Sequence, residues 1–216
     1  MKITYINHSC FVIETQGLKI VTDPFILKGQ EELINNADII LLSHLHSDHC
    51  ASINYAYCDN SKIVAIYETC NYFNSKGYKN VIGANLGGKI DISNIEISIV
   101  KAEHSSSVEE NGKIIYGGVA CGFIIKSQNQ TLYFMGDTDI FGDMKLICDF
   151  YKPTIIFMPI GNTYTLSLEK AKYAKEYLLN DAKIIPMHYN LTEISKEQLN
   201  EIKNIQIIEK LEGITL

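Results

Sequence analysis

Four side chains of metal-binding type lie within six positions, in the segment Ser43-His44-Leu45-His46-Ser47-Asp48-His49. In extended backbone, residues two apart point to the same side, so His44 and His46 can share one ion. Asp48 and His49 follow where we expect the chain to turn into a helix, which would aim them at a second ion. A catalytic metal takes at least three protein ligands, so this segment predicts further ligands elsewhere in the chain.

Three more candidate ligands stand just beyond apolar segments that we expect to be strands, namely His104, Asp137 and His188. Ligands of open α/β sheets bind beyond the carboxyl ends of strands. We therefore predict that His104 completes the first ion's ligand set and His188 the second's. Asp137 has two oxygens and could bridge both ions, which leaves a shared position for water.

Other polar residues near these segments have two interpretations each. His8, between the first two predicted strands, either orients a ligand or contacts substrate, or is a packed core histidine. Asp23, at a strand end, is a candidate acceptor that orients a metal-binding histidine. The run Ser105-Ser106-Ser107 is either plain loop or forms hydrogen bonds near the substrate, and Asp139 is expected to be a turn or cap residue. Cys50 could supply a thiolate, although every other candidate ligand is nitrogen or oxygen.

The elements that would position these residues alternate between strands and helices. Predicted strands cover residues 2–6, 10–14, 18–22, 39–42, 63–66, 81–101 with a turn at 85–88, 119–126, 131–135, 154–158, 184–187 and 205–208. Predicted helices cover residues 30–36, 50–57, 68–76, 143–150, 168–179 capped by Ser167, and 195–204, and residues 102–118 are expected to form a long polar loop. This order predicts two mixed sheets packed on each other with helices outside. Without a linker or repeat, residues 1–216 are predicted to be a single domain.

The composition restricts the class of protein. The chain has 216 residues and a formal charge of −6, and all 19 basic residues are lysines. This composition argues against electrostatic binding to a nucleic-acid backbone. No apolar leader precedes the first predicted strand, and no apolar stretch approaches the roughly 20 residues of a membrane-spanning helix. The six scattered cysteines fit reduced thiols. We expect a cytoplasmic protein that acts on small molecules, without nucleic-acid or membrane partners, and a homo-oligomer is an open alternative.

The histidine segment, with a later His, Asp and His, resembles the signature of the metallo-β-lactamase superfamily. Further segments resemble its small bacterial and archaeal metal-dependent hydrolases related to ascorbate-6-phosphate lactonase: Asn7-His8-Ser9, Thr22-Asp23-Pro24-Phe25, residues 103–107, Gly136-Asp137-Thr138, residues 141–146, Met158-Pro159-Ile160-Gly161 and Ile185-Pro186-Met187-His188-Tyr189-Asn190. Asn7 replaces the usual glycine, and Asp139 stands where glycine is common. The resemblance implies an α/β fold, a four-layer αββα sandwich of two mixed β-sheets flanked by helices, with a dinuclear site at one edge of the sheets.

The expected reaction is hydrolysis of an ester, lactone or phosphodiester. Two divalent ions about 3.5–4 Å apart would share a hydroxide that attacks a carbonyl or phosphoryl centre. Nitrogen and oxygen ligands suit zinc first and manganese second, and also iron or nickel. Two such ions, a hydroxide, and the carboxylates of Asp48 and Asp137 sum to about +1, which favours a small anionic substrate. Asp48 and His188 are candidates for assisting proton transfer, although metal ligation leaves neither a free base.

Related activities fit less well. A di-iron oxygen or nitric oxide reductase of this superfamily usually carries a carboxylate where His46 stands, together with a flavin domain. An RNA-cleaving relative carries an inserted domain and a basic surface, and a secreted antibiotic hydrolase needs an export signal. The alternative from a different class is a non-catalytic, metal-dependent ligand-binding or regulatory protein on the same fold.

Overall fold

The computed structural model describes residues 1–189 and 194–216. Asn190, the last residue of one segment that carries the resemblance, therefore lies outside the described residues. The chain forms two compact units: unit 1 comprises Met1–Leu86, Ser105–Ala120 and Ile208–Leu216, and unit 2 comprises Gly87–His104 and Cys121–Ile207. The single domain expected over residues 1–216 stays a prediction.

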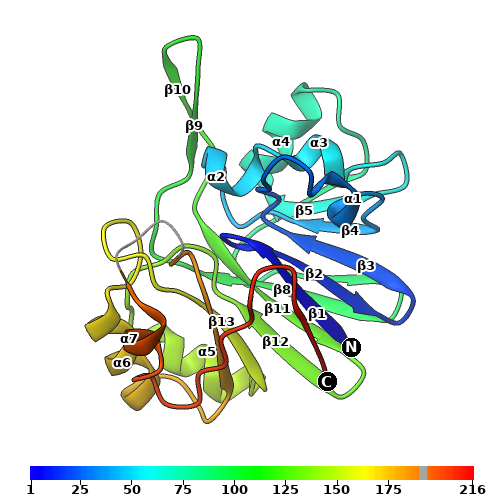
Figure 1. The fold of residues 1–216 in the computed structure, drawn as a ribbon. Helices are drawn as coiled ribbons and strands as arrows, with labels where there is room; N and C mark the ends of the chain where they lie inside the picture. The colour runs from blue at the N-terminus through cyan, green and yellow to red at the C-terminus, as the bar shows by residue number, and fades with distance from the viewer. Residues whose placement is uncertain (190–193) are drawn as a thin grey trace. The chain divides into compact units, whose positions relative to one another are not determined.

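Unit 1 is built on a seven-stranded sheet in the order β15-β1-β2-β3-β4-β5-β6 (Figure 1). Strands β15, β1, β2 and β3 pair antiparallel, whereas β3, β4, β5 and β6 pair parallel, so the sheet is mixed. The strands are β1 (Lys2–Asn7), β2 (Cys10–Thr15), β3 (Leu18–Thr22), β4 (Ile39–Leu41), β5 (Lys62–Ile66), β6 (Val81–Ala84) and β15 (Gly213–Thr215). Apolar residues at successive positions of β4 and β5 are buried, as expected for strands covered on both faces.

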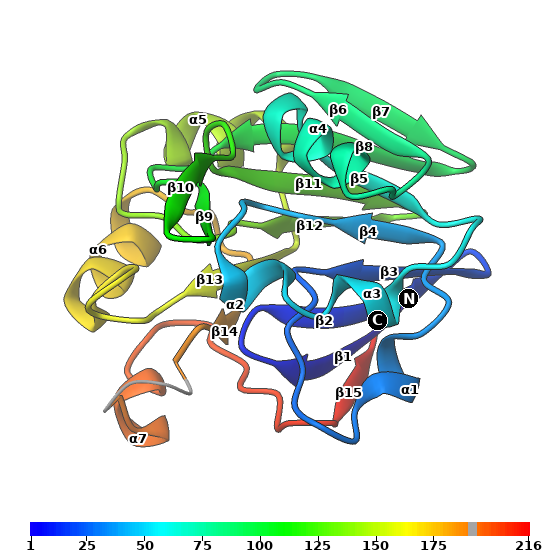
Figure 2. The same ribbon diagram turned by 90° about the horizontal axis from the view of Figure 1, so that it is seen from above.

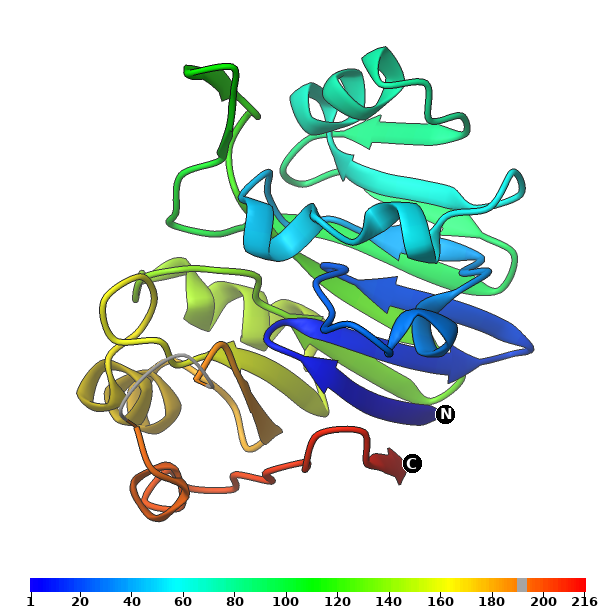
Figure 3. The same cartoon turned by 45° about the horizontal axis from the view of Figure 1, so that its top comes forward.

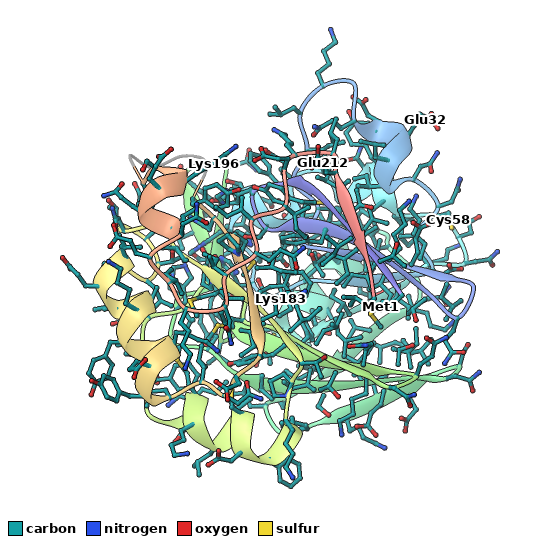
Figure 4. The ribbon with its side chains drawn as sticks, turned by 60° about the horizontal axis from the view of Figure 1, so that its bottom comes forward. Met1, Glu32, Cys58, Lys183, Lys196 and Glu212 are labelled. Carbon is teal, nitrogen blue, oxygen red and sulfur yellow. The ribbon has the colours of Figure 1, made fainter. Side chains whose placement is uncertain are left out.

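The last predicted strand, over residues 205–208, is wrong. Of these residues, only Ile205 makes a β-bridge, an isolated one to Ile184. The chain passes from unit 2 to unit 1 within the segment, so its last residue, Ile208, already belongs to unit 1. The chain instead ends in β15, which pairs antiparallel with β1. Figure 4 shows Met1 beside this strand, and the N–H of Leu216 donates to the carbonyl of Met1 at 2.9 Å.

Four helices of unit 1 lie against its sheet: α1 (Glu31–Ile34), α2 (Ser47–Cys50), α3 (Ile53–Ala56) and α4 (Tyr67–Ser75) (Figure 3). Ile34, Ile53 and Phe73 from these helices join strand residues in one buried apolar cluster. The helix expected over residues 50–57 is wrong at its start, because α2 already begins at Ser47 and a break separates it from α3. Asp48 and His49 therefore lie in the first turn of a helix, where an acidic side chain is favourable.

Unit 2 is built on a six-stranded mixed sheet in the order β14-β13-β12-β11-β8-β7, in which β12, β13 and β14 are parallel. The strands are β7 (Lys89–Ile92), β8 (Ile95–Lys101), β11 (Cys121–Ser127), β12 (Gln130–Phe134), β13 (Ile155–Pro159) and β14 (Lys183–Met187). Its helices are α5 (Asp143–Tyr151), α6 (Leu168–Tyr177) and α7 (Lys196–Leu199). Ser167 caps α6 as expected, whereas the helix predicted over residues 195–204 is reduced to α7. None of the helices described is both long and apolar enough to cross a bilayer.

A hairpin of unit 1 replaces most of the expected polar loop at residues 102–118. Strands β9 (Ser107–Glu110) and β10 (Lys113–Tyr116) pair antiparallel and form a separate two-stranded sheet. Asn111 and Gly112 have φ angles of 51° and 72°, as a two-residue hairpin turn requires. The dipeptide Asn111-Gly112 is typical of such a turn, but the surrounding segment is polar and was therefore interpreted as a loop rather than as two strands.

Candidate metal centre

In unit 1, the candidate residues lie at one edge of the sheet. Strands β1, β3 and β4 run in the same direction, because β2 is antiparallel to both of its neighbours and β4 is parallel to β3. His8 follows β1, Asp23 follows β3, and the segment from His44 to His49 follows β4. The common strand direction therefore brings these residues to the same edge.

The imidazole rings of the histidine segment cluster closely. The ring centroid of His44 lies 4.6 Å from that of His46 and 4.1 Å from that of His49. His44 and His49 are fully buried, whereas His46 is partly exposed. Several imidazole nitrogens gathered around one loop are typical of zinc sites in proteins.

Asp23 is fully buried and orients two of these histidines. Its Oδ1 accepts the backbone N–H of Ser43 at 2.8 Å, and its Oδ2 accepts the Ser43 hydroxyl at 2.6 Å and lies 2.7 Å from Nδ1 of His49. An ionised carboxylate can only accept hydrogen bonds, so Nδ1 of His49 carries the proton and Nε2 carries the lone pair that a metal needs. The Ser43 hydroxyl lies 2.9 Å from Nδ1 of His44 and fixes that ring in the same way, because its own proton goes to Asp23. The expected role of Asp23 thus extends to a second histidine.

His8 contacts the carboxylate of the segment. Its Nε2 lies 3.2 Å from Oδ2 of Asp48, and its buried ring meets the rings of Phe25 and His49 edge-on. The φ angle of His8 is 55°, a left-handed conformation that is uncommon for residues other than glycine. These contacts favour the orienting interpretation of His8 over plain packing. Ser105 also lies near a candidate ligand, since its Oγ is 3.4 Å from Nε2 of His46.

Ser106 and Gly117 hold the backbone position between the first two histidines. The sequence indicated only a loop at Gly117, whereas Ser106 belonged to a serine run that was either loop or hydrogen-bonding near the substrate. The N–H of Leu45 donates to Oγ of Ser106 at 3.1 Å, and the N–H of Gly117 donates to the carbonyl of Ser106 at 2.9 Å. A Cβ at Gly117 would lie 2.6 Å from Cβ of Leu45 and 2.7 Å from Oγ of Ser106, so a larger residue would displace both. The base of the β9–β10 hairpin therefore fixes the backbone between His44 and His46.

In unit 2, three candidates gather at one edge for the same topological reason. Strands β8, β12 and β14 run in the same direction, because β11 is antiparallel to β8 and β12, and β12, β13 and β14 are parallel. Oδ2 of Asp137 lies 3.1 Å from Nε2 of His188 and 3.8 Å from Nε2 of His104. A single carboxylate between two histidine nitrogens fits the predicted bridging role of Asp137.

Hydrogen bonds connect the segment of His104 to that of Asp137. The N–H of Glu103 donates to the Thr138 hydroxyl at 2.9 Å, and the N–H of Asp139 donates to the carbonyl of Glu103 at 3.0 Å. Thr138 is fully buried, whereas Glu103 and Asp139 are exposed, so the two bonds lie at the margin of the buried part of unit 2. The spacing of the two candidate ligands is thus set by neighbouring residues.

Two further residues of unit 2, Asp139 and Gly161, have structural roles beside the candidate ligands. The ammonium of Lys170 donates to Asp139 at 2.6 Å and holds the pKa of this carboxyl below its usual value, which agrees with a structural role for Asp139. A Cβ at Gly161 would lie 2.5 Å from Nδ1 of His188, so glycine is needed where this segment passes the ring.

The donor set fits a divalent metal. The contacts of Cys50 favour a buried, protonated thiol, because burial raises the pKa of this thiol to about 12 and its Sγ donates to the carbonyl of His46 at 3.3 Å. The candidates that remain are imidazole nitrogens and carboxylate oxygens, which zinc and manganese accept. Unit 1 supplies His44, His46, Asp48 and His49, and unit 2 supplies His104, Asp137 and His188.

Comparison with known proteins identifies the family. Residues 2–188 match the family described as the Beta-lactamase superfamily domain. A UPF0173 metal-dependent hydrolase of Methanosarcina barkeri is 37% identical over 210 residues, which cover 94% of this chain and 89% of that protein. Igni18, a metallo hydrolase from the archaeon Ignicoccus hospitalis, has a solved structure with 28% sequence identity and a TM-score of 0.85, and the match covers 100% of this chain and 97% of that chain.

A more distant likeness concerns the fold alone. YhfI of Bacillus subtilis, described as a metallo-beta-lactamase fold protein, is 13% identical with a TM-score of 0.76, and the match covers 99% of each chain. The expected fold class, α/β with two mixed β-sheets flanked by helices, is confirmed. The chain belongs to the metallo-β-lactamase superfamily.

Proposed function

We propose that this chain is a metal-dependent hydrolase with a centre for two divalent ions. In this proposal one ion is bound by His44, His46 and His104, the other by Asp48, His49 and His188, and both by Asp137. The observation that carries the proposal is that each unit gathers its candidates at the carboxyl edge of its own sheet. Hydrogen bonds orient the rings of His44 and His49, and Oδ2 of Asp137 lies within 4 Å of the Nε2 atoms of His104 and His188. The name of the Methanosarcina barkeri relative supports the same class of reaction.

The side chains around the ligands have defined roles in this proposal. Bound divalent ions supply a water molecule of lowered pKa and polarise a substrate oxygen. Asp23 keeps the protons of His44 and His49 on Nδ1, and His8 holds one oxygen of Asp48, so that these ligands need little rearrangement. Asp48 and His188 stay the candidates for assisting proton transfer. Because both would also bind a metal ion, neither would be a free base.

The proposed substrate is a small anionic ester, lactone or phosphodiester. The centre would carry a net positive charge of about +1, which attracts an anionic group although the whole chain carries −6. Zinc is the first choice of metal and manganese the second, with iron or nickel as further options. A cytoplasmic location, and the absence of nucleic-acid and membrane partners, stay predictions of the sequence.

Hydrolysis of chromogenic lactones and phosphodiesters tests the proposal. The protein is stripped with chelator, reloaded with zinc or manganese, and assayed against both panels. We expect turnover that needs the metal and that falls on the order of 100-fold or more in Asp137→Ala. The matched control is Asp139→Ala, which removes a carboxylate two positions away that pairs with Lys170 and should keep most activity. The absence of chelator-sensitive turnover across both panels would favour the non-catalytic, metal-dependent ligand-binding or regulatory protein.

A further inference from the structure

The hairpin of β9 and β10 forms a sheet of its own, separate from the seven-stranded sheet of unit 1. In the part of the chain that the structure describes, β10 pairs only with β9. Figure 1 shows the hairpin extending away from the other strands of its unit, and Figure 2 shows the same hairpin from above. A lone two-stranded hairpin is marginally stable in water, and an open strand edge is a template for pairing with another chain.

Unit 1 holds one face of this hairpin and leaves the other exposed. On the held face, the Glu110 carboxylate accepts the hydroxyl of Tyr72 in α4 at 2.5 Å and the ammonium of Lys76, the residue directly after α4, at 2.7 Å. The other face carries Ile114 and Tyr116, which are 79% and 67% exposed. Because these residues are two positions apart, their side chains point to the same side of the strand. This face of β10 thus presents two apolar side chains that its own unit does not cover, beside Glu109 of β9, which lies opposite Ile114.

The turn determines which backbone groups face the open edge. The positive φ angles at residues 111–112 identify a type I′ turn, whose flanking residues form a hydrogen-bonded pair. Hydrogen-bonded and non-hydrogen-bonded pairs alternate along antiparallel strands. The backbone groups of Lys113 and Ile115 therefore point towards β9, and those of Ile114 and Tyr116 point towards the open edge.

We propose that the open edge of β10 pairs with β10 of a second copy of this chain. A two-fold axis perpendicular to the hairpin makes the two strands antiparallel and keeps the same face outward in both copies. In the register that fits, Ile115 lies opposite the partner's Ile115, and Ile114 lies opposite the partner's Tyr116. The outward N–H and C=O groups of these residues then bond across the interface, and the exposed side chains form isoleucine–tyrosine pairs, which are favourable across strands.

Charge favours β10 over β9 as the pairing edge. In the proposed register Lys113 lies opposite the partner's Gly117, so no like charges face each other. Strand β9 contains Glu109 and Glu110, and pairing it with its own copy would gather carboxylates, which repel. The contact is small, so we expect a dimer that dissociates on dilution, with a dissociation constant of about 10 μM or weaker. The proposal does not depend on the metal centre.

Sedimentation equilibrium of the full chain tests the association. We expect a monomer–dimer equilibrium, and Ile114→Lys should raise the dissociation constant about tenfold or more, because it places a charge in each isoleucine–tyrosine pair. The matched control is Leu146→Lys on α5, a leucine that is 65% exposed, which should leave the equilibrium unchanged. Circular dichroism establishes that each variant is folded. A wild-type chain that stays monomeric up to a concentration of about 1 mM, or an association that Ile114→Lys leaves intact, would overturn the proposal.

Cysteine crosslinking tests the register. Directly opposite residues of a non-hydrogen-bonded pair have Cα atoms about 4.5 Å apart, which is within the range of a disulfide. Ile115→Cys should therefore form an intermolecular disulfide readily, whereas Ile114→Cys, opposite the partner's Tyr116, should do so at least about tenfold more slowly. Wild type under the same oxidant controls for the native thiols, of which only Cys58 is not buried. Equal crosslinking rates in the two variants would contradict the register.

Discussion

Asp23→Asn is the substitution that tests the orientation of the metal ligands most directly. The asparagine has nearly the same shape, but its amide nitrogen donates where a carboxylate oxygen accepted. Oδ1 accepts a backbone N–H, so the amide nitrogen is expected at the Oδ2 position, facing Nδ1 of His49 and the Ser43 hydroxyl. His49 must then move its proton from Nδ1 to Nε2, which removes the lone pair from the atom that should bind the metal. The Ser43 hydroxyl loses its acceptor as well, so His44 is no longer fixed in one tautomer.

The size of the effect follows from these contacts. Loss of a residue that orients a metal ligand typically lowers metal affinity 10- to 100-fold, or about 1.4–2.8 kcal/mol. Because Asp23 serves His44 and His49, which belong to different ions in the proposal, we expect both metal equivalents to bind more weakly. Ser43→Ala is the matched control, since it removes the link to His44 but keeps the 2.7 Å contact between Asp23 and His49. In Ser43→Ala only one equivalent should weaken.

Competition titration with a chromogenic zinc chelator measures both affinities, and thermal melting of the metal-free variants shows whether the fold is kept. Two metal equivalents bound by Asp23→Asn with wild-type affinity would refute the reasoning about tautomers. Equal weakening of both equivalents in Ser43→Ala would refute the separate assignment of His44 and His49.

Three other predictions concern the ligands, the hairpin base and the buried thiols. Metal analysis should find that Asp137→Ala loses most bound metal and that His188→Ala loses about half, whereas full loading of both would contradict the ligand assignment. Gly117→Ala should lower the free energy of unfolding by about 1–3 kcal/mol and weaken metal binding, because its Cβ would lie 2.6 Å from that of Leu45, and Gly142→Ala, where nothing lies within 4 Å, should not. Burial raises the pKa of the Cys50 thiol from 9.0 to about 12, so the unfolded chain loses this proton first and stability should fall as the pH rises above 9.0. Urea unfolding at two pH values checks this, and a fall of the same size in Cys50→Ala would count against Cys50 as a cause.

Much of the fold and most of the candidate ligands followed from the sequence, because the patterns that reveal them are local. Alternating and continuous apolar runs placed most strands of both sheets within a residue or two, but residues 89–101 were interpreted as one strand, whereas the structure has β7 and β8 with a turn between them. The spacing of His44, His46, Asp48 and His49 pointed to metal binding, since few other functions need these residue types so close together. Where each candidate follows a strand, strand direction alone explains why the candidates of one unit meet at one edge.

Other features depended on contacts between distant segments, which no local pattern records. The sequence proposed Asp23 as a partner of one ligand, but only the folded chain brings its carboxylate to both Ser43 and His49. Gly117 holds the backbone at Leu45 from more than seventy positions away. The separate hairpin and the C-terminal strand beside β1 were also missed, because short strands take their stability from the partner that they pair with rather than from their own residues.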